Sequence, residues 1–143
     1  LQHHLLTAIL LWIERWYDAA RTEDRPADDA PAELHRRFAR QLEQDFARHH
    51  DAGHYANALR VPAATLSRAL AEATGRTTKE LILDRVMLEA ARLLRFTDRT
   101  VGEIAFAIGF TDPLYLLRAF KRHFGVPPIA YREGVRGRKS MHS

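Results

Sequence analysis

The chain has 143 residues, of which 46% are hydrophobic and 28% are charged, as in an ordinary folded domain. It contains no cysteine, so a disulfide framework, a thiolate metal site and a cysteine nucleophile are all excluded. The longest apolar run, AILLWI at residues 8–13, is far shorter than the roughly 18 residues that a membrane-spanning helix needs, and nothing resembles a signal peptide. We therefore expect a cytoplasmic protein with no membrane partner.

The net charge of +4 is unevenly distributed along the chain. Residues 1–53 carry 7 Lys and Arg against 10 Asp and Glu, whereas residues 54–143 carry 15 against 8. A basic block favours polyanions because it neutralises phosphates and releases their counterions. An ordinary solvated surface is the common alternative, so the charge alone does not decide the function.

The first expected element is an amphipathic helix within residues 1–20, because apolar residues such as Leu5, Ile9 and Trp12 recur there at spacings of three and four. One such helix cannot bury its apolar face alone. We therefore expect it to dimerise or to dock on an upstream domain. Because the chain begins with Leu1 rather than methionine, we also expect it to be part of a longer protein.

An acidic segment with two prolines, residues 21–33, predicts a linker. A second helix is expected from Pro31 to His49. Its apolar residues recur every four positions, at Leu34, Phe38, Leu42 and Phe46. Residues 34–135 are predicted to form the main domain, and the basic tail over residues 136–143 is expected to be flexible.

The sequence after residue 53 contains an internal repeat. Residues 55–75 align with residues 104–125, so that Arg68 meets Arg118, once one extra residue is allowed in the second copy; the two units are predicted at residues 54–75 and 102–125. Each copy has the pattern of a short helix, a tight turn and a longer helix, which predicts two helix-turn-helix units.

The two turns differ in their residues. Gly109 supplies a permissive backbone in the second turn, whereas Arg60 holds the matching place in the first, which predicts a strained or differently shaped turn there. Asp112 and Pro113 are expected to cap and begin the last helix of the second unit, while Pro62 offers no capping oxygen to the first.

A long helix is predicted between the two units, over residues 78–97, because this segment contains no Gly or Pro and is rich in helix formers. A helix of this length measures roughly 28 Å. Successive major-groove faces on one side of B-DNA lie about 34 Å apart, so we expect such a rod to hold two recognition helices in adjacent grooves.

The helical periodicity predicts which residues of each second helix face outward. The inward set is Leu66, Ala69, Leu70 and Ala73 in the first copy and Leu116, Ala119, Phe120 and His123 in the second. The outward set is Ala64, Ser67, Arg68 and Ala71 in the first and Leu114, Leu117, Arg118 and Lys121 in the second. An outward arginine can bind guanine with two hydrogen bonds or clamp a phosphate. Arginine is common on any solvated helix. Arg68 and Arg118, however, occupy equivalent positions of the two copies, and this coincidence favours a DNA-binding function.

Two segments resemble a known family at this point. EIAFAIGFTDPLYLLRAFKRHFGVPPIAYR is similar to the signature of the AraC/XylS family of bacterial transcription regulators, and ATLSRALAEATGRTTKELI resembles that family's first helix-turn-helix. The resemblance covers about residues 55–132. It implies an all-α fold of two helix-turn-helix subdomains joined by a long central helix, with one or two packing helices before them.

The resemblance also implies the function and the partners. Members of the family bind promoter DNA and usually activate transcription. Implied partners are double-stranded DNA, RNA polymerase, a second copy in a homodimer and a small-molecule effector that binds an upstream domain. A protein-interaction module with incidental DNA affinity remains the alternative from another class.

Site residues follow from the matching positions of the family's motif. The base-facing set is Ala63, Ala64, Ser67, Arg68, Pro113, Leu114, Leu117 and Arg118, and the phosphate-facing set is Lys121 and Arg122. Small polar residues are usual where Leu114 and Leu117 stand. Three interpretations of these leucines stay open: contact with thymine methyl groups, contact with another protein, or partial burial.

Other chemistry has less support in the sequence. His49, His50 and His54 with Asp45 and Asp51 nearby could suggest a metal site, since two of the histidines lie four positions apart. Gly53 stands between them and there is no third fixed ligand, so solvated histidines at a helix end are the expectation. No motif places a histidine and a carboxylate next to Ser67, and there is no Gly-rich phosphate loop. We therefore expect no enzyme, no catalytic residue, no metal and no cofactor.

Overall fold

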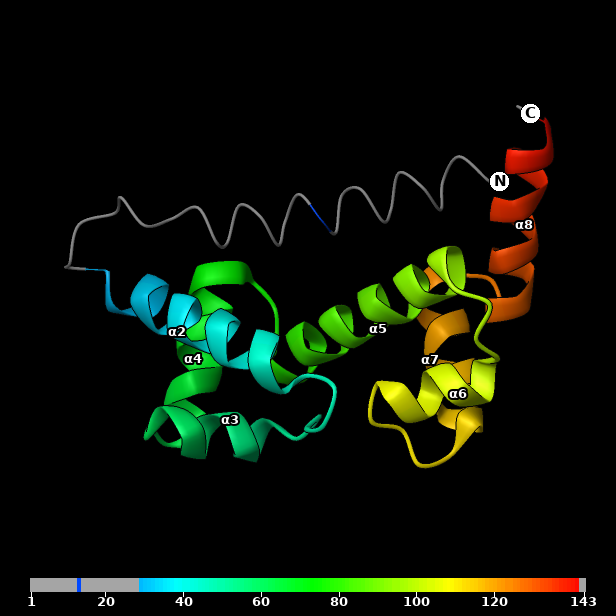
Figure 1. Cartoon of the computed structure of the whole chain (residues 1–143). Helices are drawn as coiled ribbons and strands as arrows, with labels where there is room; N and C mark the ends of the chain where they lie inside the picture. Colours follow the sequence, from blue (N-terminus) through cyan, green and yellow to red (C-terminus); the bar gives the residue numbers. More distant parts are fainter. Residues whose placement is uncertain (1–12, 14–28, 142–143) are drawn as a thin grey trace. The chain divides into compact units, whose positions relative to one another are not determined.

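The structure is a computed structural model that describes residue 13 and residues 29–141. All regular elements in this part of the chain are helices, which confirms the all-α prediction there (Figure 1). In chain order they are α2 (Ala30–Asp45), α3 (Ala52–Leu59), α4 (Ala63–Thr74), α5 (Thr78–Phe96), α6 (Val101–Ala107), α7 (Pro113–Phe124) and α8 (Pro128–Met141). Apart from Ile13, the helix predicted within residues 1–20 lies outside the described residues. None of the described helices combines the length and apolarity that crossing a bilayer requires.

The chain divides into two compact units, and the boundary falls after Arg85, within α5. The described part of one unit, residues 29–85, holds the α3–α4 pair, and the described part of the other, residues 86–141, holds the α6–α7 pair. Each unit therefore contains one of the two predicted helix-turn-helix motifs. Helix α5 is uninterrupted, as predicted.

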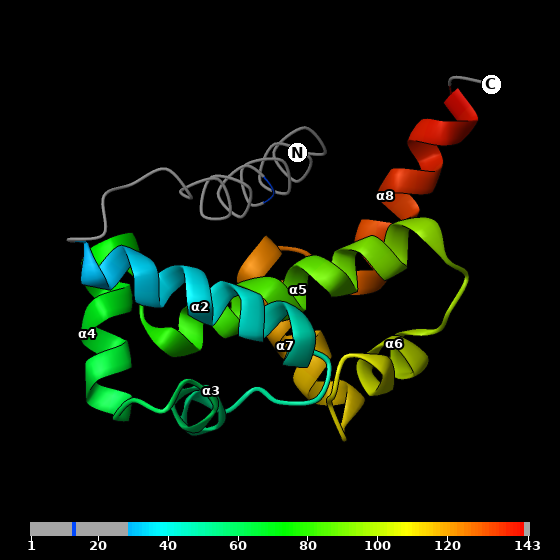
Figure 2. The ribbon, with the colours of Figure 1, turned by 60° about the vertical axis from the view of Figure 1, so that its left-hand side comes forward.

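Helix α2 begins one residue earlier than predicted. The Asp29 side chain accepts a hydrogen bond from the Ala32 amide at 3.4 Å, and Pro31 lies in the first turn, where its missing N–H costs nothing. Residues 30–33 therefore belong to α2, so the predicted end of the linker at residue 33 is wrong. Phe38 and Leu42 are fully buried where α2 packs on α3 and α4 (Figure 2).

The same helix ends earlier than predicted, at Asp45 rather than at His49. Its continuation is replaced by a turn, and the His49 carbonyl accepts a hydrogen bond from the Tyr55 hydroxyl at 2.7 Å. Tyr55 is fully buried and its ring meets that of Phe38 edge-on, with the centroids 5.5 Å apart. The contact between Phe38 and Tyr55 spans 17 positions and leaves no local pattern in the sequence.

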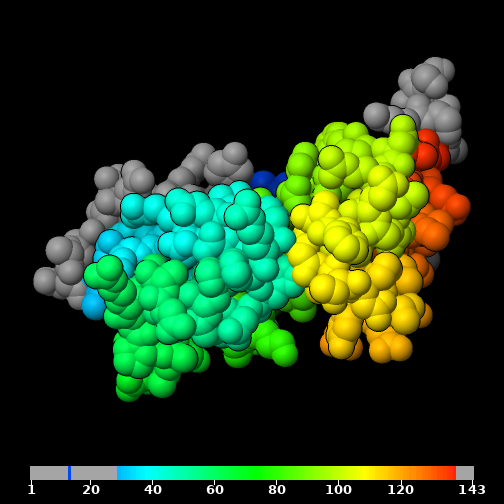
Figure 3. Space-filling view, turned by 60° about the horizontal axis from the view of Figure 1, so that its bottom comes forward, coloured from blue at the N-terminus to red at the C-terminus, as the bar shows by residue number. Residues whose placement is uncertain are grey.

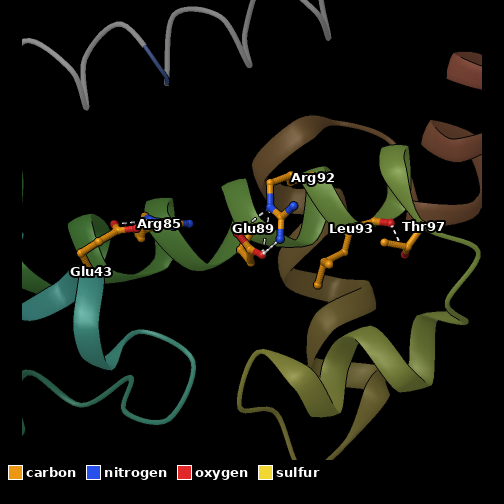
Figure 4. Close-up of polar contacts among 6 residues, drawn as sticks. All are labelled: Glu43, Arg85, Glu89, Arg92, Leu93 and Thr97. Carbon is orange, nitrogen blue, oxygen red and sulfur yellow. Dashed lines mark hydrogen bonds and ion pairs between the residues drawn. The ribbon is translucent and has the colours of Figure 1, made fainter.

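Two arginines tie the helices of this unit together. Arg37 donates to the carbonyl of Leu59, the last residue of α3, at 3.1 Å. Arg85 donates through two nitrogens to the two carboxylate oxygens of Glu43, each at 2.8 Å (Figure 4), and its guanidinium also lies over the Phe46 ring. The hydrogen bond from Arg85 lowers the pKa of Glu43 from its ordinary value.

The turn of the first motif places Arg60 in the left-handed region, with φ of 58°. Gly109, its counterpart in the second motif, has φ of 94°. The following residue donates its N–H to the carbonyl five positions back in both turns, from Val61 to Ala56 at 3.1 Å and from Phe110 to Ala105 at 2.9 Å. The two turns therefore share a hydrogen-bonding pattern, and the prediction of strain is confirmed because a side chain with a Cβ occupies the left-handed conformation.

Replacing Arg60 by glycine is expected to raise the free energy of unfolding by about 1 kcal/mol, because glycine adopts this conformation without steric cost. Urea denaturation measures the change. Arg99→Gly is the matched control, since Arg99 is equally exposed but has no positive φ. We expect the control to lose stability or stay unchanged, and an Arg60→Gly protein no more stable than the parent would contradict the strain.

The second unit is organised around α6 and α7. Thr100 and Glu103 form a reciprocal capping box at the start of α6, with the Glu103 amide 3.1 Å from the Thr100 hydroxyl oxygen. The core of the motif is fully buried and consists of Ile104, Ala105, Ile108, Leu116 and Phe120. Helix α8 continues this core, because the Tyr131 ring contacts Phe120 at a centroid distance of 5.6 Å.

The end of α5 is held by a side chain from α8. Arg132 donates to the carbonyls of Leu94 and Thr97, at 3.0 and 3.1 Å. The last carbonyls of a helix have no partner within the helix, so this arginine satisfies two of them. The Thr97 hydroxyl donates to the Leu93 carbonyl at 2.6 Å, and Figure 4 shows this contact beside the Glu89–Arg92 ion pair on the same helix.

The prediction of a flexible tail from residue 136 is wrong for residues 136–141, which continue α8 to Met141. No proline interrupts the chain after Pro128, and Arg136 forms an ion pair with Asp98 that ties α8 to the loop between α5 and α6. Residues 142–143 lie outside the described part.

Candidate nucleic-acid interface

The ends of α7 are fixed by residues that the sequence indicated. The Asp112 side chain accepts a hydrogen bond from the Leu114 amide at 3.0 Å, and Pro113 is the first helical residue. Gly125 ends the helix in the left-handed conformation, with φ of 81°. These features confirm the predicted capping and set the position at which α7 begins.

One face of α7 anchors it to its own unit. Leu116 and Phe120 are fully buried, and Ala119 and His123 beside them are half-buried. Because a helix turns by about 100° per residue, the opposite face is centred near Arg118. The packing of α7 thus presents that side chain to the outside.

Three cations lie on the outer side of α7, namely Arg118, Lys121 and Arg122, and all three are exposed. None of them forms an ion pair with a carboxylate among the described residues. Arg92 and Arg136 of the same unit, by contrast, pair with Glu89 and Asp98. The charge on α7 is therefore available to a ligand, and Figure 3 shows the α6–α7 surface in yellow and orange.

The apolar part of the outer face differs from the prediction. Leu114 is 52% exposed, as predicted, whereas Leu117, which was grouped with it on the outward side, is half-buried; for Leu117 this agrees with the third interpretation, partial burial. The helical angle explains this, since Leu117 lies about 100° from Arg118 and Leu114 only about 40°. Tyr115 was missed as an outward residue. It is 65% exposed and lies about 60° from Arg118 on the other side, which the same periodicity could have indicated.

Helix α4 holds the equivalent place in the other unit. Its predicted outward residues are all exposed: Ala63, Ala64, Ser67, Arg68 and Ala71. Leu66, Ala69 and Leu70 are buried as predicted, but Ala73 is exposed, so its inward assignment was wrong. Thr74 is half-buried instead, and its hydroxyl donates to the Leu70 carbonyl at 2.7 Å.

The two helices differ in charge and in capping. Arg68 is the one cation of α4, and Glu72 lies one turn later, so the helix carries no net charge, whereas α7 carries three cations and no acidic residue. Pro62 precedes α4 without a side-chain cap, as predicted. The α7 surface is therefore the stronger attractor for a polyanion.

The histidines form a structural cluster. His54 lies 2.7 Å from an Asp45 oxygen and stacks on His49 with the ring centroids 3.7 Å apart. Hydrogen bonds from His54 first and Gln41 second lower the pKa of Asp45. No group of three His, Asp or Glu side chains in the described part has the arrangement of a metal site.

A short helix packed under a capped second helix, with an exposed cationic face on the second, defines the helix-turn-helix class of DNA-binding proteins. The family model described as "Helix-turn-helix domain" matches residues 55–134, more than half of the chain. The chain belongs to this family, the AraC type of DNA-binding transcription regulators.

Relatives and solved structures agree with this assignment. The transcriptional activator RhaS of Escherichia fergusonii is 37% identical over 70 residues, which are 49% of this chain and 25% of RhaS. The DNA-binding domain of AdpA, solved in complex with a target DNA, matches with a TM-score of 0.68 and 30% identity over 75% of this chain and 96% of that domain. The C-terminal domain of the response regulator yesN from Fusobacterium nucleatum matches with a TM-score of 0.64 and 25% identity, over 67% of this chain and 94% of that one.

The similarity to the activators covers only part of those proteins. The matches span 25% of the RhaS relative and 22% of the activator FapR of Escherichia coli. Both names describe those proteins as HTH-type transcriptional activators. The chain therefore matches about a quarter of the length of these activators.

Proposed function

We propose that this chain binds promoter DNA sequence-specifically and activates bacterial transcription in the cytoplasm, with α4 and α7 each entering a major groove. The observation that carries the proposal is Arg118, which is exposed at the centre of the outer face of α7 and has no ion-pair partner in the described part of the chain. An arginine so placed is available for two hydrogen bonds to guanine.

Base and phosphate contacts are assigned by position on the two recognition helices. The proposed base-facing residues are Ala63, Ala64, Ser67, Arg68, Pro113, Leu114 and Arg118. Lys121 and Arg122 are proposed to bind phosphates, because they lie in the last turn of α7, whereas the N-terminal residues of a recognition helix contact base edges. Leu117 is left with a mainly structural role, since it is half-buried.

Partners beyond DNA are proposed from the relatives. Activation requires contact with the transcription machinery, so RNA polymerase is the proposed protein partner. The chain matches about a quarter of the activators' length, and we propose that effector binding and homodimer formation, where they occur, reside in sequence outside the helix-turn-helix units. The names of the relatives describe regulators and no enzyme, and we propose no catalytic activity.

Replacing Lys121 by alanine is expected to weaken binding to all duplexes by a similar factor and to reduce the slope of log affinity against log salt by about 1, because one phosphate contact is lost. Fluorescence anisotropy over a series of salt concentrations measures both. Arg92→Ala removes the same charge from α5, where Glu89 already neutralises it, and is expected to change the slope less. A change in base preference in the Lys121 variant would contradict its assignment to phosphate.

A further inference from the structure

The first turn of α7 exposes two large apolar side chains at the end of the helix that reaches base edges in this class of protein. Leu114 is 52% exposed and Tyr115 is 65% exposed. They lie on either side of the direction in which Arg118 points, at about 40° and 60° from it around the helix axis. Neither side chain contributes to the buried core of the unit.

The backbone of this turn has little hydrogen-bonding capacity to offer a ligand. Pro113 has no N–H. The Leu114 amide donates to the Asp112 side chain at 3.0 Å, and the Tyr115 amide donates to the Asp112 carbonyl at 3.1 Å. Contact at this turn is therefore made chiefly by side-chain carbon atoms.

The major groove offers one apolar group to such a surface, the C5-methyl group of thymine. Leu114 and the ring carbons of Tyr115 cannot read the donors and acceptors of the base edges, but they gain free energy by burying a methyl group. The Tyr115 hydroxyl can donate or accept a hydrogen bond, and the Tyr115→Phe variant below removes it. We infer that Leu114 and Tyr115 recognise thymine through its C5-methyl group, next to the guanine that Arg118 binds. This inference rests on the proposed function and adds the kind of base that α7 selects.

The position of these residues favours DNA over a protein as the occupant. The cations Arg118, Lys121 and Arg122 share the outer side of α7 with the apolar pair and have no carboxylate partners among the described residues. A protein surface would have to supply acidic groups for all of them, whereas phosphates flank every thymine in a duplex. Binding of Leu114 to a protein is one outcome of the test below.

The test uses the whole chain and a duplex that it selects from random sequences. Each thymine of the selected site is replaced in turn by deoxyuridine, which lacks only the methyl group and pairs in the same way. We expect uracil beside the guanine that depends on Arg118 to weaken binding by about fourfold per methyl group. At the same position, 5-methylcytosine is expected to bind about fourfold more tightly than cytosine, which shows that the methyl group and not the thymine O4 is read.

Variants connect the methyl group to the side chains. Leu114→Ala is expected to abolish the difference between thymine and uracil at one position, and Tyr115→Phe, which keeps the ring, is expected to preserve it. Phe106→Ala is the matched control, because Phe106 is 76% exposed on α6 and its removal is expected to leave the uracil effect intact.

Four results would overturn the inference. Equal binding of thymine and uracil duplexes at every position near that guanine would exclude methyl recognition, while sequence selection itself would leave the proposed function standing. If uracil still weakened binding of the Leu114→Ala protein, the thymine methyl group would be recognised by another residue. Unchanged affinity and base preference of Leu114→Ala on all duplexes would show that Leu114 does not contact DNA, as expected if this side chain binds protein instead. Failure to select any sequence would overturn the proposed function together with the inference.

Discussion

Replacing Arg118 by alanine is expected to weaken binding to the selected duplex by about 1 to 3 kcal/mol and to relax the preference at one base position. The guanidinium lies at the centre of the outer face of α7 and has no ion pair within the described residues, so its removal leaves the fold intact and takes away only contacts to DNA. Titration of the selected duplex and of single-base variants measures both effects.

Arg118→Lys separates charge from geometry. Lysine keeps the positive charge but lacks the planar pair of donors that matches guanine, so general affinity is expected to persist while the preference for guanine falls. Arg92→Ala, which removes an arginine paired with Glu89, is expected to leave the preference unchanged. An equal loss of affinity on every duplex after Arg118→Ala would make Arg118 a phosphate contact instead.

The largest expected effect on stability comes from Arg132. Its replacement by alanine is expected to lower the free energy of unfolding by about 2 kcal/mol, because the carbonyls of Leu94 and Thr97 both lose a charged donor at the end of α5. The midpoint of urea denaturation measures the change, with the slope of the transition as a check that the same surface unfolds.

Arg136→Ala is the matched control for this variant. Arg136 also comes from α8, but it pairs with Asp98 at the surface, where such an ion pair contributes at most about 1 kcal/mol. We expect the control to stay close to the parent protein. Equal destabilisation by the two substitutions would show that Arg132 acts as one more surface charge and does not cap α5.

The sequence predicts the elements of this fold well where the signal is local. Asp112 and Pro113 mark the start of α7, and the absence of Gly and Pro marks α5 as one helix. The internal repeat indicates both helix-turn-helix units, and it locates the strained Arg60 by comparison with Gly109. The capping residues and the unbroken helix are indicated by residues within a few positions of one another, and the repeat is visible because two segments of the sequence can be compared directly.

Features set by distant contacts could not be predicted in the same way. The Tyr55 ring packs against Phe38, 17 positions earlier, and the role of Arg132 depends on carbonyls 35 and 38 positions earlier in the chain. The sequence alone does not indicate either contact, because it does not show which helices pack together.

The candidate site could be predicted from the sequence only in part. The outward positions of Arg68 and Arg118 follow from periodicity, and both side chains are exposed. Ala73 was assigned to the core side but is exposed, and Leu117 was grouped with the outward residues but is half-buried. A division of each helix into two faces does not describe residues on its flanks, and it does not show how far the neighbouring helices extend. Tyr115, on such a flank, was missed for the same reason.

Selection of binding sites from a pool of random duplexes, carried out in parallel with the unchanged chain and with Arg118→Ala, tests sequence-specific recognition by α7 most directly. We predict that the unchanged chain enriches one motif containing a guanine, and that the variant loses the preference at that position while retaining the rest of the motif. Enrichment of no motif by the unchanged chain, or of an identical motif by both proteins, would contradict the account.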